Sequence, residues 1–224
     1  MIKHISFDLW LTLIKSHPEF KKQRADFLRK EFNPHGFTLA DVIEIVQNTD
    51  KFCDRINEIN GKKIQTELMY KRILLKLGCN PEMINDDLLA EIKVVGNELF
   101  MNYQPEFINT SIRPILDTLR NTGFDLNLSS NTGFIEGNII SCTLKNLNIF
   151  DYFNFFVYSD EINASKPSFD FFDKVYEQIC FQKNEVLHIG DNYNADYVGA
   201  LKYGFKALHI INKQYTINDI TRHL

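Results

Sequence analysis

Short apolar runs that alternate with helix-like stretches constrain the fold of this 224-residue chain more than any other feature. We expect buried parallel strands over residues 2–8, 124–129, 155–159, 186–189 and 207–211. Helix-like stretches lie between the later strands, over residues 112–121, 133–147, 168–180 and 194–203. Strands that alternate with helices indicate a parallel sheet covered on both faces. The predicted fold class is therefore α/β, with a doubly wound parallel sheet.

The stretch between about residues 17 and 104 has a different character, with few strand-like runs. Its amphipathic patterns predict helices over residues 19–32, 39–56, 65–77 and 81–101. Thr38 or Asp41 could begin one of these helices, and Asn80 with Pro81 could begin another. We therefore predict an α/β core formed by residues 1–15 and 106–224, with a helical cap over residues 16–105.

Charge and cysteine content exclude several classes of protein. The net charge of −4 and the pI of about 5.9 provide no basic face for nucleic acid. No run of 18 or more apolar residues is present, so no membrane span is expected. The four cysteines are far apart and include no Cys-x-x-Cys pair, which favours reduced thiols and a cytoplasmic location. Composition leaves the oligomeric state open.

Polar residues lie at the carboxyl ends of four of the predicted strands, or in the loops that follow them. Asp8 ends the first strand, Ser130 ends the second, and Lys166 follows the third. Asp191 and Asp196 follow the strand over residues 186–189. Each has an ordinary structural explanation alone, such as helix capping for Asp191. Ligands collect at the carboxyl ends of the strands in open α/β sheets, so the combination predicts a functional site.

These residue types are suited to phosphoryl transfer through a covalent aspartyl intermediate. A carboxylate such as Asp8 can attack phosphorus, but two anions must then approach each other. Mg²⁺ would neutralise them, and it prefers hard oxygen ligands. Asp8, Asp191 and the backbone carbonyl of Trp10 can supply such oxygens. Lys166 adds a positive charge, and Ser130 with the N–H of the following Asn131 can hydrogen-bond phosphate oxygens.

Four ordered motifs in this chain resemble those of the haloacid dehalogenase superfamily of hydrolases. They are Phe-Asp-Leu-Trp-Leu-Thr-Leu from residue 7, Leu-Ser-Ser-Asn from residue 128, Ser-Lys-Pro from residue 165 and Gly-Asp-Asn-Tyr-Asn-Ala-Asp from residue 190. The helical segment between the first two motifs resembles the helical cap of that family. The resemblance covers essentially the whole chain.

The resemblance implies a role for each matching residue. Asp8 would be the nucleophile and a metal ligand, and the carbonyl of Trp10 would also bind the metal. Asp191 would bind Mg²⁺, with Asp196 beside or behind it. Lys166 would hold the phosphate and the nucleophile together. Two hydroxyl residues, Thr12 and Ser130, would order the phosphate site.

Trp10 departs from the pattern of the phosphatases that this chain resembles, which carry a second Asp at this position. That Asp protonates the leaving alcohol and later activates water. An indole has only a donor N–H and exchanges no proton near neutral pH. Loss of a general acid–base costs roughly 10²–10⁴ in rate. Leu11 departs as well, because glycine is usual there.

Three functions are left open by this departure. The first is a Mg²⁺-dependent hydrolase of small phosphorylated metabolites, with an acid–base from the cap or with substrates that have good leaving groups. The second is a 2-haloacid dehalogenase, which releases halide without a proton and often carries an aromatic residue at this position. The third is a weakly active or non-catalytic ligand-binding protein. The retained Gly190, Asp191 and Asp196 favour the first, because displacement of halide needs no metal.

Two sets of residues in the predicted cap have suitable chemistry without support from spacing. His17, Glu19 and His35 could replace the missing acid–base. Dehalogenases of this superfamily use a cap arginine to hold the substrate. The arginines available for that role are Arg24, Arg29, Arg55 and Arg72.

Overall fold

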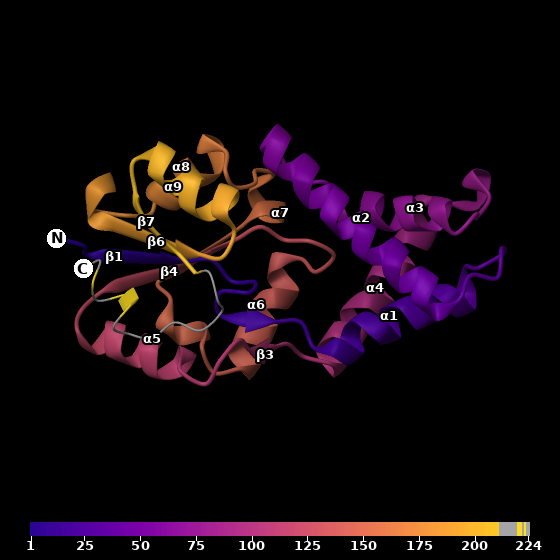
Figure 1. The fold of residues 1–224 in the computed structure, drawn as a ribbon, viewed down its shortest axis with the longest axis horizontal. Helices are drawn as coiled ribbons and strands as arrows, with labels where there is room; N and C mark the ends of the chain where they lie inside the picture. The colour runs from indigo at the N-terminus through magenta and orange to yellow at the C-terminus, as the bar shows by residue number, and fades with distance from the viewer. Residues whose placement is uncertain (211–218, 221, 223–224) are drawn as a thin grey trace.

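A five-stranded parallel sheet forms the centre of the molecule (Figure 1). The computed structural model describes residues 1–210, 219–220 and 222. In spatial order the strands are β5 (Phe155–Tyr158), β4 (Asp125–Ser130), β1 (His4–Phe7), β6 (Val186–Gly190) and β7 (Lys206–His209). Each lies within two residues of a predicted strand, although the last residue of the predicted strand over 207–211 is outside the described residues. The α/β fold class is confirmed.

Strand β1 lies in the middle of the sheet, and its register sets the position of the site. Phe7 pairs with Leu128 of β4 on one side and with Ile189 of β6 on the other. The N–H of Asp8 donates to the carbonyl of Ile189 at 2.8 Å, which continues the ladder by one residue. All residues of β1 are buried, as expected for a strand covered on both faces. Asp8 therefore emerges at the edge where β4 and β6 also end.

Helices cover both faces of the sheet (Figure 1). Helices α5 (Ile112–Asn121) and α6 (Gly137–Asn146) pack on one face, in a core cluster with Ile5 and Phe7. Helices α8 (Phe169–Tyr176) and α9 (Gly199–Tyr203) pack on the other, in a cluster with Val157. A short helix, α7 (Ser159–Ile162), follows β5. This arrangement is a doubly wound sheet.

Some predicted helix boundaries were wrong. Helix α6 begins at Gly137 instead of residue 133. Phe134 packs outside this helix, against Tyr70 of the segment predicted as the cap, with ring centroids 5.1 Å apart. This contact explains the later start of the helix. Helix α8 ends at Tyr176 instead of residue 180. The helix predicted over residues 194–203 is a π-helical turn at Tyr193–Val198 followed by α9.

Four helices from the predicted cap segment pack together beside the sheet (Figure 1). They are α1 (Pro18–Glu31), α2 (Leu39–Asn60), α3 (Thr66–Lys76) and α4 (Asp86–Asn102), here called the helical bundle. Thr38 and Asp41 form a reciprocal capping box at the start of α2, as their types favour. The division into core and cap at residues 15 and 105 stays a prediction.

The single helix predicted over residues 81–101 was wrong. Asn80 begins only a short 3₁₀ turn, Pro81–Met83. Asn85 then accepts a hydrogen bond from the N–H of Leu88 and starts α4. Two capping asparagines in close succession therefore divide this segment into two elements.

A two-stranded antiparallel sheet was not predicted. It pairs β2 (Ile14–Lys15) with β3 (Glu106–Phe107), at the points where the chain enters and leaves the helical bundle. Strands of two residues show no hydrophobic period, so the sequence carried no signal for them. Among the helices that the structure describes, none is long and apolar enough to cross a membrane.

Candidate active site

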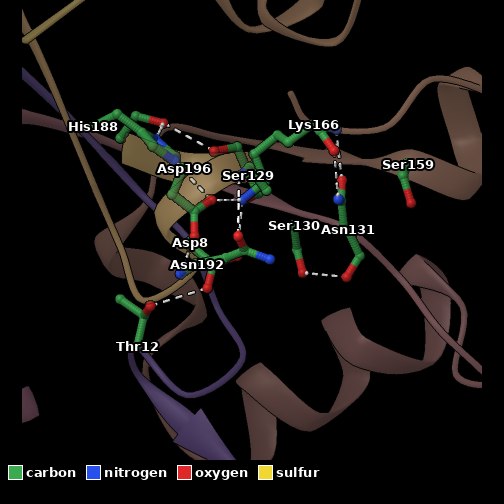
Figure 2. Close-up of polar contacts among 12 residues, drawn as sticks. Asp8, Thr12, Ser129, Ser130, Asn131, Ser159, Lys166, His188, Asn192 and Asp196 are labelled. Atoms are coloured by element: carbon green, nitrogen blue, oxygen red, sulfur yellow. Dashed lines mark hydrogen bonds and ion pairs between the residues drawn. The ribbon is translucent and has the colours of Figure 1, made fainter. Parts of the chain in front are cut away.

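Asp8 lies at the centre of a buried polar cluster at the sheet edge (Figure 2). Its Oδ1 accepts a hydrogen bond from the Lys166 ammonium at 2.8 Å, and its Oδ2 accepts one from the Thr12 hydroxyl at 3.0 Å. Burial raises the pKa of Asp8 to about 7, against the opposing effect of Lys166, and the carboxylates of Asp196 and Asp191 add to the increase. The carboxyl group is thus fixed in orientation and holds a proton more readily than an exposed aspartate.

Lys166 connects three parts of the site through its ammonium group (Figure 2). The side chain is 1% exposed and donates to Asp8 at 2.8 Å, to Asp196 Oδ1 at 2.6 Å and to the carbonyl of Ser129 at 2.9 Å. Burial alone would lower the pKa of Lys166, but the two carboxylates more than offset this and raise it. All three donors of the ammonium are used, so its position is set by the core.

Asn131 holds the backbone of Lys166 from the second motif (Figure 2). Its side-chain oxygen accepts from the N–H of Lys166 at 2.8 Å, and its amide group donates to the Lys166 carbonyl at 3.0 Å. The hydroxyl of Ser130 donates to the carbonyl of Asn131 at 3.1 Å. Sequence reasoning found both residues but missed this two-point contact, because the partners are 35 positions apart.

Asp196 reaches the cluster from the π-helical turn after β6. Its Oδ2 accepts from the N–H of Asn192 at 3.0 Å. Burial by itself would raise the pKa of Asp196, but Lys166 and His188 hold it below its usual range. Gly190 is required beside it, because a Cβ on residue 190 would lie only 2.3 Å from the Asp196 carboxylate.

His188 contacts Asp196 from the interior of the sheet. It also belongs to a chain of buried polar groups on three neighbouring strands, β6, β1 and β4. Its Nε2 lies 3.2 Å from Asp196 Oδ1, and its Nδ1 lies 3.1 Å from the Ser6 hydroxyl. That hydroxyl is 3.0 Å from the hydroxyl of Ser129. Burial lowers the pKa of His188, so the ring is neutral near pH 7, with Nε2 donating to the carboxylate and Nδ1 accepting from Ser6.

The side chains of Asp8, Asp191 and Asp196 could hold a divalent cation. One carboxylate oxygen of each lies within 4.8 Å of the others. Three carboxylates around a single ammonium leave this site with excess negative charge, which a hard cation such as Mg²⁺ would neutralise. Both oxygens of Asp8 and both oxygens of Asp196 already accept hydrogen bonds, so hydrogen bonding does not rank one of these two carboxylates above the other as a metal ligand. The residues present therefore fit a metal ion.

A cavity of about 430 Å³ separates the sheet edge from the helical bundle. Asp8, Asn131 and Lys166 line it from the sheet side, together with Asp191 and Asp196. Thr12 and Ser130 are fully buried and are not among its lining residues. The charged side chains of the bundle that line it are Lys21, Arg24, Asp50, Asp54 and Glu58.

The sequence of residues 5–210 matches the family of haloacid dehalogenase-like hydrolases. The chain belongs to this family. A search of curated protein sequences finds no match.

Solved structures of other members share the fold of this hydrolase. The HAD phosphatase from Thermococcus onnurineus has 19% identity and a TM-score of 0.69, with 99% of this chain and 97% of that chain covered. The HAD-hydrolase YfnB from Bacillus subtilis, bound to magnesium, has 19% identity and a TM-score of 0.68, with coverage of 94% and 89%. L-2-haloacid dehalogenase from Xanthobacter autotrophicus, with chloropropionic acid covalently bound, has 16% identity and a TM-score of 0.63, with coverage of 99% and 82%. Phosphatases and dehalogenases are thus both represented.

Trp10 lines the cavity of this hydrolase beside the nucleophile position. Its indole is half-buried and meets Phe100 of α4 edge to face, with ring centroids 6.2 Å apart. The next residue, Leu11, has a φ of 60°, in the left-handed region that favours glycine. The tryptophan therefore fills space between the sheet and the bundle. The coordination of a metal by its carbonyl stays a prediction.

The structure contradicts three candidates for a replacement acid–base. His17 caps α1, where it accepts from the N–H of Glu19. His35 packs against Phe37, at the far end of α1. None of His17, Glu19 and His35 lines the cavity: His17 lies just before α1, Glu19 lies in its first turn, and His35 lies in the turn between α1 and α2.

Four arginines of the predicted cap were candidates for holding a substrate. Of these four, only Arg24 lines the cavity. Arg29 pairs with Asp26 at 2.8 Å on the surface. Arg72 stacks on Phe52, with its guanidinium 3.8 Å from the ring centroid. A substrate-binding role is therefore limited to Arg24.

Proposed function

We propose that this hydrolase is a Mg²⁺-dependent phosphatase that acts on a small phosphorylated metabolite through an aspartyl-phosphate intermediate. The observation that carries the proposal is the group of Asp8, Asp191 and Asp196, with oxygens within 4.8 Å of one another beside a buried lysine. Displacement of halide from carbon needs no metal, and a metal on Asp8 would weaken its attack. This candidate cation site therefore favours phosphate as the group transferred.

In the proposed reaction, an Asp8 carboxylate oxygen bonds to phosphorus while the bond from phosphorus to the leaving oxygen breaks. Bound Mg²⁺, held by Asp8, Asp191 and the Trp10 carbonyl, would neutralise charge between the two anions. The ammonium of Lys166, 2.8 Å from Asp8, stabilises the charge that builds on the phosphoryl group. The Asn131 contact keeps Lys166 in place. Water then attacks phosphorus, which breaks its bond to Asp8 and releases inorganic phosphate.

Trp10 leaves both steps without the usual proton donor and acceptor. The leaving oxygen must depart as an anion or take its proton from water. We therefore expect aryl and acyl phosphates, whose leaving groups are stable anions, to react faster than simple alkyl phosphates. The expected difference is roughly 10²–10⁴-fold, the usual contribution of general acid–base catalysis. Equal rates on both classes would contradict this role for the substitution.

The direct test is release of p-nitrophenol from p-nitrophenyl phosphate, with Mg²⁺ and with EDTA. We expect release that depends on Mg²⁺ and stops with EDTA. No release with any divalent metal at high enzyme concentration would refute the proposal. It would leave a ligand-binding protein as the better interpretation.

Mg²⁺ should also stabilise the folded protein. At ten times its Kd, a ligand of the native state adds about 1.4 kcal/mol of stability. For a chain of this size that corresponds to a rise in Tm of about 3–6 °C. Burial raises the pKa of Asp8 to about 7, so below pH 7 the metal must displace a proton. The shift should therefore be larger at pH 8 than at pH 6.

Differential scanning fluorimetry with and without 10 mM MgCl₂ measures this shift. Asp191→Asn is the matched variant and should lose most of the shift. Asp170→Asn, at an exposed position of α8, should keep it. An equal shift in all three proteins would place the metal elsewhere.

Dehalogenation is a second candidate, and one observation favours it. Arg24 is 6% exposed and lines the cavity, where its guanidinium could hold the carboxylate of a 2-halo acid. Chloride release from 2-chloropropionate that is unaffected by EDTA would move the assignment to this function. Absence of chloride release, with p-nitrophenyl phosphate hydrolysed, would exclude it.

A further inference from the structure

The bundle wall of the cavity carries opposite charges on two neighbouring helices. Asp50, Asp54 and Glu58 recur every four residues along α2, so they share one face of that helix. Lys21 and Arg24 are three residues apart on α1 and share a face as well. All five line the cavity that contains Asp8. A ligand with its phosphate at Asp8 would therefore present its other end to this mixed wall.

Arg24 is a buried cation held between aromatic rings. It is 6% exposed, and its guanidinium lies 4.2 Å from the centroid of the Phe134 ring and 4.9 Å from that of Phe20. Its Nε has no hydrogen-bond partner among the residues described. By stacking on Phe134, Arg24 of the bundle contacts the loop that follows Asn131. A planar guanidinium fixed in this way is suited to bind a carboxylate through two parallel hydrogen bonds.

Asp50 brings the opposite charge to the same region. Its Oδ1 would lie 3.3 Å from a Cβ added to Gly133, two residues after Asn131. Burial raises the pKa of Asp50, and the nearby cations Arg24, Lys21 and Lys63 lower it. Asp54 is exposed, whereas Glu58 accepts a hydrogen bond from Asn192 at 2.7 Å. Asp50 is thus the acid of this face best placed to meet a ligand near the phosphate loop.

Arg24 and Asp50 influence each other electrostatically but form no ion pair in the part of the chain that the structure describes. A charge that is buried or half-buried is costly unless it is paired or hydrogen-bonded. A ligand that carries an ammonium and a carboxylate would satisfy both: the carboxylate at Arg24 and the ammonium at Asp50. A ligand with one of these groups would satisfy only one residue.

We propose that the bundle wall is a subsite for a zwitterion, so that the substrate class is a phosphorylated compound with an adjacent ammonium and carboxylate at its far end, as in a phosphorylated amino acid. The proposal rests on the proposed function for the location of the phosphate at Asp8. It assigns Arg24 and Asp50 to selection of the substrate and gives them no part in the bond-breaking steps.

Isothermal titration of the intact protein with Mg²⁺ tests this subsite, because binding does not depend on the leaving group. The probes are O-phosphoserine, with both charges; phosphoethanolamine, with the ammonium; phosphoglycolate, with the carboxylate; and glycerol 3-phosphate, with neither. We expect O-phosphoserine to bind about 10- to 100-fold more tightly than each of the other three, as charged hydrogen bonds contribute. Equal affinities for all four would overturn the proposal.

Two variants should each remove one half of this preference. Arg24→Gln should weaken O-phosphoserine to the level of phosphoethanolamine, and Asp50→Asn should weaken it to the level of phosphoglycolate. Arg24→Lys keeps the positive charge but lacks the two parallel N–H donors of the guanidinium, so its affinity for O-phosphoserine should be intermediate. This variant serves as the test if Arg24→Gln does not fold. Arg29→Gln, on the outer surface of α1, is the matched control and should keep the full preference. Preserved preference in the folded Arg24 and Asp50 variants would refute the subsite.

These results separate the subsite from the proposed function. Hydrolysis of p-nitrophenyl phosphate without a preference among the four probes would refute the subsite and leave the phosphatase proposal intact. A preference for O-phosphoserine in a protein that hydrolyses no phosphoester would support the subsite. In that case the protein would bind such compounds without turning them over.

Discussion

Asp8→Asn is expected to abolish hydrolysis of p-nitrophenyl phosphate, with a loss of at least about 10⁴-fold in kcat. The amide has nearly the shape of the carboxylate, but it cannot form the bond to phosphorus. It also removes one charged ligand of the proposed metal site. The measurement is steady-state release of p-nitrophenol at saturating Mg²⁺, and intact-protein mass spectrometry should find a phosphoryl adduct in the wild type alone.

Asp160→Asn is the matched control for this experiment. Asp160 accepts hydrogen bonds from the N–H of Gly137 at the start of α6 and is not among the residues that line the cavity. Its replacement should leave kcat within a few-fold of the wild type. Activity in folded Asp8→Asn above about 1% of the wild type, a loss of only about 2.7 kcal/mol of transition-state stabilisation, would show that Asp8 is not the nucleophile.

Lys166→Met should impair both stability and activity. It leaves the carboxylates of Asp8 and Asp196 buried without the ammonium that now lies 2.8 Å and 2.6 Å from them. Removal of one partner from a buried ion pair typically costs about 3–5 kcal/mol. We expect the free energy of unfolding in urea, measured in EDTA at pH 7.5, to fall by about that amount. Hydrolysis should be lost even where the variant is folded.

The stability difference should depend on pH in a defined direction. Lys166 holds the pKa of Asp196 below its usual range, so this pair stabilises the fold above the ordinary pKa of an aspartate. Its contribution is lost as the pH falls towards the lowered pKa and Asp196 takes up a proton. The difference between wild type and Lys166→Met should therefore be large at neutral pH and shrink below about pH 4.

Lys174→Met is the control for the loss of a lysine. Lys174 is 50% exposed and binds Glu177 on the surface of α8. Exposed pairs of this kind contribute only about 0–1 kcal/mol, so this variant should unfold close to the wild type. A cost below about 1 kcal/mol for Lys166→Met as well would mean that the buried cluster adds little to stability.

The sequence predicted the sheet because buried strands produce continuous apolar runs, and these runs are local. It also predicted that Asp8, Lys166 and Asp196 would converge, since parallel strands end at one edge. Boundaries were less reliable where a tertiary contact decided them. The packing of Phe134 against Tyr70 moves the start of α6 from the predicted residue 133 to Gly137. No residue pattern near position 133 indicates that contact.

The sequence did not indicate how the site residues are held. Asn131 binds Lys166 across 35 residues, and His188 connects to Ser6 across 182. Residue spacing cannot reveal such pairs, because they depend on strand order and register. The three candidates proposed for a missing acid–base were wrong for the same kind of reason. The orientation of a helix relative to the sheet decides which of its faces lines the cavity.

Local residue patterns in the sequence by themselves indicated the family and the fold class, and both are confirmed. The roles of the four motifs and the replacement of the usual acid by Trp10 stay predictions from the sequence. Only the tertiary structure decided that Trp10 packs on Phe100, that Arg24 and Asp50 line the same cavity as Asp8, and that no ion pair joins them within the described residues. The physical reason is that motifs are short and contiguous, so their residue types show in the sequence. The far wall of the cavity comes from two helices whose relative packing involves the whole bundle.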